Sequence, residues 1–153
     1  MMILESQLAD IEAIKQLKAR YPRFADTKQW DEFAELFAED VDVVMELYPR
    51  PSKDHPMAPA HFKGRDALIA GNAPNLVGVT TIHNVYSAEI EIMSSTEAKG
   101  IWSMQVKVIS PHLIFNGWGF YHELYVKIGD SWKFKKIHLT AIHVEEQWVS
   151  LEG

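Results

Sequence analysis

The side chains that could carry chemistry in this chain are its seven histidines, its carboxylates and its tyrosines, because the 153 residues include no cysteine. Without cysteine, thiolate catalysis, cysteine-ligated zinc and iron–sulfur clusters are excluded. An imidazole changes its charge near neutral pH and can pass protons to and from a substrate, especially beside a carboxylate that orients it. Acid–base chemistry by a histidine and a carboxylate is thus the first possibility.

The spacing of the histidines does not predict a metal site. His138 and His143 are five residues apart on an expected strand, so a regular pleat points them to opposite faces, while His55 and His61 fall in a proline-rich loop. Residues 117–119 (Gly-Trp-Gly) lie within an expected strand rather than at a strand-to-helix turn, so they do not form a phosphate-binding loop. We therefore expect neither a protein-bound metal nor a cofactor.

Asp26 follows the first expected helix and has two interpretations. Its spacing to Gln29 favours an N-cap of a second helix, since aspartate accepts N–H bonds at helix starts and a capping box has this spacing. Alternatively, Thr27 takes the cap and leaves Asp26 free to turn inward at the mouth of a cavity.

His83 and two tyrosines also have structural interpretations, which the residues alone favour. His83 stands between Ile82 and Val85 on an expected strand, where a satisfied core histidine is the commoner case. Tyr21 and Tyr121 are amphipathic aromatics that pack in cores with the hydroxyl group on water.

The apolar spacing of the first part of the chain predicts two helices, the first of which carries Tyr21. Residues 4–25 have one apolar stripe at intervals of three and four, and residues 27–39 have a second. Pro22 lacks an N–H group and clashes one turn back, so it should end or kink the first helix near Arg20 or Tyr21.

A strand, a loop and a short helix should follow. Residues 41–48 are rich in valine and predict a strand. Four prolines within residues 49–59 indicate a loop, and residues 64–71 predict a helix that ends at Gly71.

The remainder of the chain reads as long strands. They are expected at 81–93, 98–108, 113–128 and 131–144. The parity of the apolar positions switches near Tyr86 and again between Phe134 and Ile137, which indicates β-bulges. A Gly129–Asp130 turn joins the last two strands.

Two or three helices followed by a run of strands indicate an α+β fold with a strongly curved antiparallel sheet. The first helix would close this sheet into a cone around an apolar cavity, a plausible site for a small molecule. The cavity wall is expected to include Tyr48, Trp102, Met104, Val106, Tyr121 and Leu139.

Length and composition limit the other possibilities. A chain of 153 residues with 47% hydrophobic and 24% charged residues is typical of one globular domain, here 1–153. A net charge of −6 argues against nucleic acid as a partner. No apolar run approaches the roughly 20 residues of a membrane span, and Glu5 and Asp10 interrupt any leader pattern, so we expect a cytoplasmic protein.

Five segments carry a resemblance to a known family, in chain order. They are residues 10–21 (DIEAIKQLKARY), 26–31 (DTKQWD), 64–67 (GRDA), 82–84 (IHN) and 125–132 (YVKIGDSW). Together they resemble the SnoaL-like group of the NTF2-like superfamily over nearly the whole chain. The first helix most resembles bile-acid 7α-dehydratases, and the Asp and His positions resemble scytalone dehydratases and hexachlorocyclohexane dehydrochlorinases.

This resemblance implies a conical α+β fold, usually oligomeric, and an eliminating enzyme whose cavity holds an Asp–His pair. Carried over by position, the pair falls on Asp26 and His83, and the dehydratase tyrosine falls on Tyr21. The resemblance therefore reverses the structural interpretations of Asp26 and His83.

The chain also departs from the relatives it resembles. The second histidine of scytalone dehydratase falls near Val108, and Val106 stands where bile-acid dehydratase has an aspartate. Ala25 and Met45 stand where scytalone dehydratase has the tyrosines that polarise the substrate carbonyl. Tyr121 stands where that enzyme has an asparagine in its pocket. The acid–base pair is kept, but the residues that read the substrate differ, so we expect a different substrate.

The sequence thus predicts a cofactor-independent lyase that acts beside a carbonyl of a small hydrophobic or polycyclic substrate. His83 would be the base, Asp26 would orient it, and Tyr21 or Tyr121 would bind the enolate oxygen. The same groups could serve a ketone isomerase or a polyketide-type cyclase. A non-catalytic binding protein and a partner subunit of an oxygenase are the remaining alternatives. A homo-oligomer, dimer or trimer, is expected.

Overall fold

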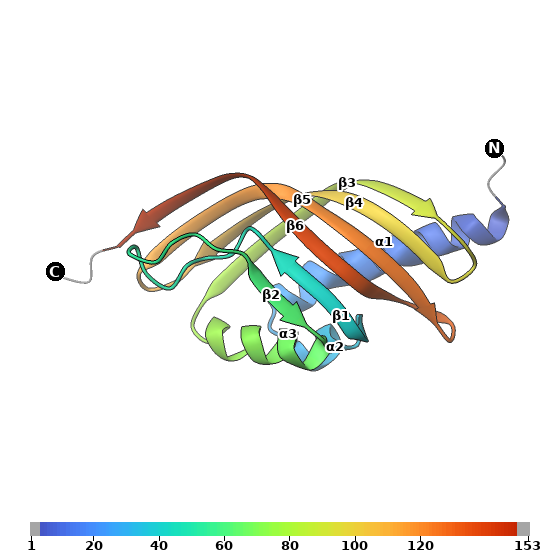
Figure 1. Ribbon diagram of the computed structural model, residues 1–153, viewed down its shortest axis with the longest axis horizontal. Helices are drawn as coiled ribbons and strands as arrows, with labels where there is room; N and C mark the ends of the chain where they lie inside the picture. The colour runs from blue at the N-terminus through green and yellow to red at the C-terminus, as the bar shows by residue number, and fades with distance from the viewer. Residues whose placement is uncertain (1–3, 150–153) are drawn as a thin grey trace.

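Six strands form one curved, unclosed sheet in the computed structural model, which describes residues 4–149 (Figure 1). The strands are β1 Phe37–Met45, β2 Ala60–Lys63, β3 Thr80–Ile92, β4 Glu97–Ile109, β5 Leu113–Ile128 and β6 Ser131–Trp148. Their order across the sheet is β2-β1-β6-β5-β4-β3. Both ends of the expected domain 1–153 lie outside the described residues. The predicted α+β class and conical curved sheet are confirmed.

One pair of strands differs from the expected antiparallel sheet. β1 runs parallel to β6, whereas every other neighbouring pair is antiparallel. The connection from β1 to β6 passes through all the remaining strands, so the first strand can enter the sheet in either direction without a tight turn.

β-bulges produce the curvature, as the parity switches predict. β3 shifts register between Tyr86 and Glu89, and Ser87 has a positive φ of 55°. The β5–β6 pairing shifts at Lys135, and it shifts a second time at Ile142, which the sequence pattern did not indicate. Because a bulge bends its strand and increases the twist, these irregularities curl the sheet around its inner face.

Helix α1 (Glu5–Asp26) lies along the concave side of the sheet (Figure 1). Of the two expected effects of Pro22, an end or a kink near Arg20 or Tyr21, the end does not occur, because the helix continues for one more turn, to Asp26. The backbone N–H and the hydroxyl of Thr27 both donate to the Arg23 carbonyl and so close that turn. Tertiary packing of the helix face compensates for the bond that proline removes.

The second predicted helix, 27–39, is also too long. Helix α2 spans only Trp30–Ala34, and β1 begins at Phe37 rather than at residue 41. Phe37 pairs with Phe134 of β6, and both rings are almost completely buried. Burial of the phenylalanine in the sheet core outweighs the helical spacing of the segment.

Helix α3 (Arg65–Asn72) confirms the predicted short helix, and a 3-10 turn, Pro74–Leu76, follows it. The proline-rich loop ends sooner than expected because β2 begins at Ala60. His61 therefore lies on β2, opposite Val44, rather than in the loop. No described helix is both long and apolar enough to cross a membrane.

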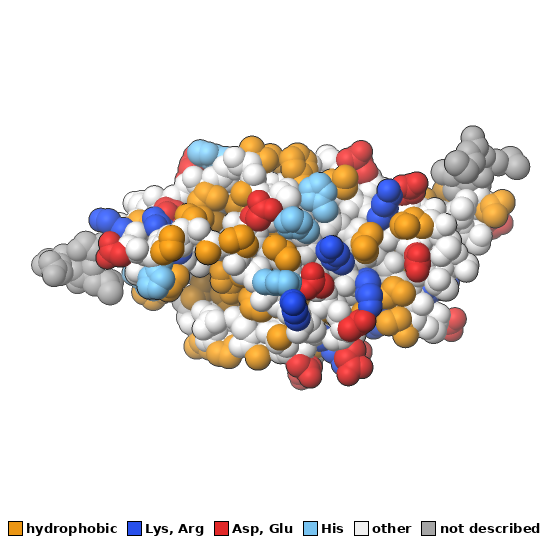
Figure 2. Space-filling view, viewed as in Figure 1, with side chains coloured by type: hydrophobic (Ala, Val, Ile, Leu, Met, Phe, Trp, Pro, Cys, Tyr) orange, Lys and Arg blue, Asp and Glu red, His pale blue; other side chains and the backbone are white. Residues whose placement is uncertain are grey.

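The core lies between the inner face of the sheet and the helices. The alternation predicted for β4 is confirmed: Trp102, Met104, Val106 and Val108 are buried. The outer face is mixed, and Figure 2 shows histidine side chains near the middle of the face in view. In the β5–β6 pairing, His122 lies opposite His138. The cavity that follows from this arrangement is on the inner face.

Candidate active site

The carboxylate of Asp26, at the C-terminal end of α1, binds β3 through three hydrogen bonds. The Thr81 hydroxyl donates to Oδ1 at 2.8 Å, and the His83 backbone N–H donates to Oδ2 at 2.8 Å. His83 Nδ1 lies 2.6 Å from Oδ1. The favoured N-cap interpretation of Asp26 is wrong, because α2 has no side-chain cap and Asp26 faces β3 instead.

These bonds indicate which nitrogen of the His83 ring carries the proton. A carboxylate only accepts hydrogen bonds, so Nδ1 carries the proton, and in the neutral ring Nε2 is the unprotonated nitrogen. The His83 side chain is 18% exposed and that of Asp26 is 22% exposed, so the pair is largely shielded from water. His83 lines the adjoining cavity, whereas Asp26 does not. A ligand in the cavity would therefore contact the imidazole rather than the carboxylate.

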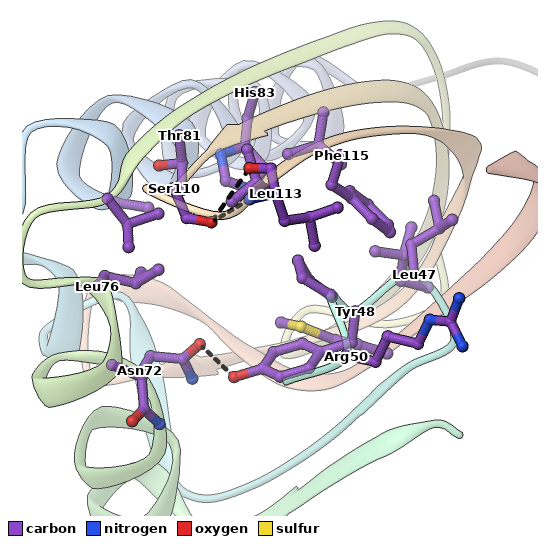
Figure 3. A pocket seen from close by; sticks show the side chains of 18 of the residues that line it. Leu47, Tyr48, Arg50, Asn72, Leu76, Thr81, His83, Ser110, Leu113 and Phe115 are labelled. Atoms are coloured by element: carbon purple, nitrogen blue, oxygen red, sulfur yellow. Dashed lines mark hydrogen bonds between the residues drawn. The ribbon is translucent and has the colours of Figure 1, made fainter. Parts of the chain in front are cut away.

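A cavity of about 570 Å³ opens between the inner face of the sheet and the helices. Figure 3 shows His83 and Thr81 on one side of it and Tyr48 and Asn72 on the other. Besides His83, six residues predicted from sequence line it: Tyr21, Tyr48, Met104, Val106, Tyr121 and Leu139. Sequence reasoning missed further lining residues, including Leu47, Arg50, Asn72, Leu76, Ser110 and Phe115.

Trp102, expected in the cavity wall, does not line it. The alternation of β4 assigns this residue to the correct face, but it lies farther along the strand, beyond the end of the cavity. Its indole N–H donates to the Tyr125 hydroxyl at 2.9 Å within the core.

Two tyrosines stand side by side at the cavity next to His83. The rings of Tyr21 and Tyr121 are 5.6 Å apart and nearly perpendicular, and the Tyr21 ring is 6.4 Å from that of His83. Burial raises the pKa of both phenols, so both remain protonated donors at neutral pH. The Tyr121 hydroxyl is buried and, apart from the neighbouring Tyr21 hydroxyl, has no hydrogen-bond partner among residues 4–149.

A buried ion pair that the sequence analysis missed lies below these tyrosines. Lys18 Nζ is 2.6 Å from Glu123 Oε2, and both side chains are 0% exposed. Glu123 Oε1 also accepts a hydrogen bond from the Tyr125 hydroxyl at 2.7 Å. The parity of β5 contained a signal, because Glu123 shares the inward face with Tyr121 and Tyr125.

Polar groups also stand at the far side of the cavity. The Tyr48 hydroxyl donates to Asn72 Oδ1 at 3.4 Å (Figure 3). Arg50 lines the cavity, but its guanidinium is engaged by Glu146 at 2.8–3.2 Å and by the His55 carbonyl at 2.6 Å. The side of the cavity opposite His83 is therefore polar but not strongly charged.

Metal-binding geometry is not found in the part of the chain that the structure describes. No three histidine, aspartate or glutamate side chains there could hold one ion. His138, on the outer face, contacts Glu46 at 2.7 Å instead.

Known structures share this fold. A putative scytalone dehydratase from Novosphingobium aromaticivorans superimposes with a TM-score of 0.80 at 23% identity, over 97% of this chain and 94% of that chain. A hexachlorocyclohexane dehydrochlorinase from Novosphingobium barchaimii superimposes with a TM-score of 0.74 at 18% identity, over 93% and 92%. These likenesses confirm the expected NTF2-like fold.

Sequence comparison gives a family and a relative. A probable cyclase from Gibberella zeae is 25% identical over 142 residues, which are 85% of this chain and 89% of that protein. Residues 6–138 match the SnoaL-like domain.

Proposed function

This chain belongs to the SnoaL-like domain family, and we propose that it is a lyase of the dehydratase type that works without a cofactor. It would remove a proton beside a carbonyl of a small hydrophobic or polycyclic substrate and expel water from the neighbouring carbon. The observation that carries the proposal is the 2.6 Å contact between Asp26 and His83 at the wall of a largely apolar cavity.

In the first step, His83 Nε2 takes the proton from the carbon next to the carbonyl. The C–H electron pair moves into an enolate, and the imidazolium that forms is stabilised by the Asp26 carboxylate on Nδ1. In the second step the enolate re-forms the carbonyl, and its carbon–carbon electron pair forms a new double bond to the neighbouring carbon as the C–O bond there breaks. The C–O pair leaves with the hydroxyl, to which His83 returns its proton to give water. Asp26 is a positioning residue throughout, because it does not line the cavity.

Charge develops on the substrate oxygen during the first step, and the two tyrosines can bind it. Tyr21 and Tyr121 line the cavity, and burial keeps both phenols protonated. Donors that are already oriented stabilise an enolate without reorganisation, which is a large term in such reactions. We assign this role to Tyr121 first, because its ring lies nearer to the Lys18 ammonium, at 3.3 Å against 4.2 Å for Tyr21.

The cavity wall supports a hydrophobic substrate. Met104, Val106 and Leu139 are apolar and buried along the wall. A volume of about 570 Å³ lies within the range of pockets that enclose drug-sized molecules. The polar groups lie at opposite sides, with His83 on one and Tyr48 and Asn72 on the other.

The comparisons favour elimination chemistry and offer a second candidate. Two proteins of the same fold are a putative dehydratase and a dehydrochlorinase. The Gibberella zeae relative is a probable cyclase, and the same enolate could attack a second carbonyl to close a ring instead of expelling water.

Two features disfavour the non-catalytic alternatives. A binding protein in which Asp26 only caps α2 would have its carboxylate on backbone N–H groups, away from His83, whereas it binds the His83 ring. A partner subunit of an oxygenase should have a filled cavity, whereas this one is open.

The test is turnover of cyclic β-hydroxy ketones, followed by the ultraviolet absorbance of the conjugated product. Wild type should convert at least one ketone, and His83→Gln should be slower by about 10²- to 10⁴-fold, the usual contribution of a general base. His143→Gln is the matched control, because His143 is exposed on the outer face. Equal rates for wild type and His83→Gln would overturn the assignment, and ring closure without loss of water would favour the cyclase.

A further inference from the structure

The Lys18–Glu123 pair is an unusual feature of this core. A lysine side chain that is 0% exposed has lost all its hydration, and burial lowers the pKa of Lys18 while Glu123 counteracts the shift. Replacing such a pair by apolar residues of similar volume is often neutral or stabilising, so stability alone does not explain its presence. Neither residue lines the cavity.

The ammonium of Lys18 is enclosed by aromatic rings. Its Nζ lies 3.3 Å from the centre of the Tyr121 ring, 4.2 Å from that of Tyr21 and 5.4 Å from that of Phe134. Contacts within about 6 Å are cation–π interactions, which strengthen when water is excluded. The two nearest rings belong to the two tyrosines beside His83.

A positive charge against the face of a phenol changes the hydroxyl on its edge. It withdraws electron density from the ring and stabilises negative charge there, so the O–H group becomes a stronger hydrogen-bond donor. In a buried site this effect is weakly screened. The charge of Glu123 acts in the opposite direction on both phenols. The Lys18 ammonium, however, lies directly against the Tyr121 ring, 3.3 Å from its centre.

We propose that Lys18 is a positioning residue of the active site, which strengthens Tyr121 as the hydrogen-bond donor to the enolate oxygen. Lys18 does not touch the substrate, and it acts through the ring 3.3 Å from its ammonium. This inference rests on the proposed function, because the proposed reaction requires a hydrogen-bond donor to the enolate oxygen and Lys18 would strengthen that donor. Glu123 keeps Lys18 charged, and Tyr125 and Trp102 hold Glu123 in place.

A merely structural role for the ion pair makes a different prediction. A pair that only fastens α1 to β5 would, when removed, weaken the binding of every ligand equally. An electrostatic role instead affects the hydrogen bond from Tyr121 to the ligand oxygen. That bond is stronger when the oxygen carries more negative charge, so the loss should be confined to ligands with an acidic hydroxyl. Matched ligands with and without an acidic hydroxyl therefore distinguish the two roles.

The experiment uses 2-naphthol and its more acidic 6-cyano derivative, which are aromatic enols, with 2-methoxynaphthalene as the control ligand. Dissociation constants are measured by fluorescence for wild type, for the neutral-pair variant Lys18→Met/Glu123→Gln, for Tyr121→Phe with and without the neutral pair, and for His83→Gln. The double variant removes both charges together, which leaves no unpaired ion in the core. Circular dichroism and thermal unfolding verify that each variant is folded.

We expect wild type to bind the cyano derivative most tightly. The neutral-pair variant should lose about tenfold in naphthol affinity, in line with a desolvated cation–π interaction, and more for the cyano derivative. Its affinity for 2-methoxynaphthalene should change less than about twofold. Adding the neutral pair to Tyr121→Phe should cost nothing further, because the charge acts through that phenol.

The outcomes separate this inference from the proposed function. If Tyr121→Phe and His83→Gln weaken naphthol binding but the neutral pair does not, Lys18 has no such role and the proposed function stands. If wild type binds neither ligand, or none of the variants matters, both fail. Wild type provides a second test without substitution: in ¹⁵N-lysine NMR at neutral pH, Lys18 Nζ must be an ammonium, and a neutral amine would overturn the inference.

Discussion

Removal of Lys18 alone should be far more damaging than removal of the whole ion pair. In Lys18→Met the Glu123 carboxylate stays in a site that is 0% exposed and, among the described residues, keeps only the Tyr125 hydroxyl as a donor. Truncating one member of a buried pair typically costs about 3–5 kcal/mol, because an uncompensated charge is left behind. For a domain of this size each kcal/mol lowers Tm by about 2–4 °C, so we expect a loss of about 6–20 °C.

The double variant Lys18→Met/Glu123→Gln removes that charge. Glutamine can still accept the hydrogen bond from Tyr125, so we expect its free energy of unfolding to lie within about 1 kcal/mol of wild type. Urea unfolding followed by circular dichroism gives all the values that the double-mutant cycle needs. The reasoning is refuted if Lys18→Met is as stable as wild type, or if the double variant is as unstable as the sum of the two single variants.

Three further predictions concern the site and the sheet. Asp26→Asn should slow proton abstraction by about 10²-fold or more, because the amide cannot accept both donors of His83. Asp31→Asn, at an exposed position, is the control. Equal rates for wild type and Asp26→Asn would contradict the positioning role. Gly119→Ala should destabilise the fold by about 3 kcal/mol or more, since its Cβ would overlap the Thr140 carbonyl oxygen, and urea unfolding measures the loss. Burial raises the pKa of Tyr125 above its ordinary value of 10.0, so the native state keeps a proton that the unfolded chain releases. Stability should therefore be intact below pH 10 and fall above it by about 1.4 kcal/mol per pH unit for this phenol. The Tyr125 phenolate is followed at 295 nm as the difference between wild type and Tyr125→Phe, and its appearance without loss of structure would contradict this.

Alternation predicted the long strands well, because one face of each is buried and the other is not. β5 has the predicted bounds, 113–128, and the bulge expected near Tyr86 is present. The helices were less predictable. α1 continues past Pro22 because Thr27, which follows the helix, closes its last turn by donating to the Arg23 carbonyl. The segment after α2 joins the sheet because Phe37 is buried against β6.

The site was predictable only in part. Spacing alone favoured a cap for Asp26, since the sequence does not show that β3 presents three donors to it; only the family resemblance paired Asp26 with His83. Glu123 could have been noticed as an acidic residue at an inward position of β5. Lys18 could not, because a lysine beside a helical apolar stripe usually reaches water with its charged end.

The most direct test of the account is exchange of the proton beside a carbonyl, because this step needs no knowledge of the natural substrate. Wild type, His83→Gln and the control His143→Gln are incubated with 1-tetralone in D₂O, and NMR follows deuterium entering the carbon next to the carbonyl. The account predicts acceleration by wild type and by His143→Gln, and a loss of about 10²-fold or more in His83→Gln. Exchange by His83→Gln at the wild-type rate would contradict the claim that His83 removes this proton.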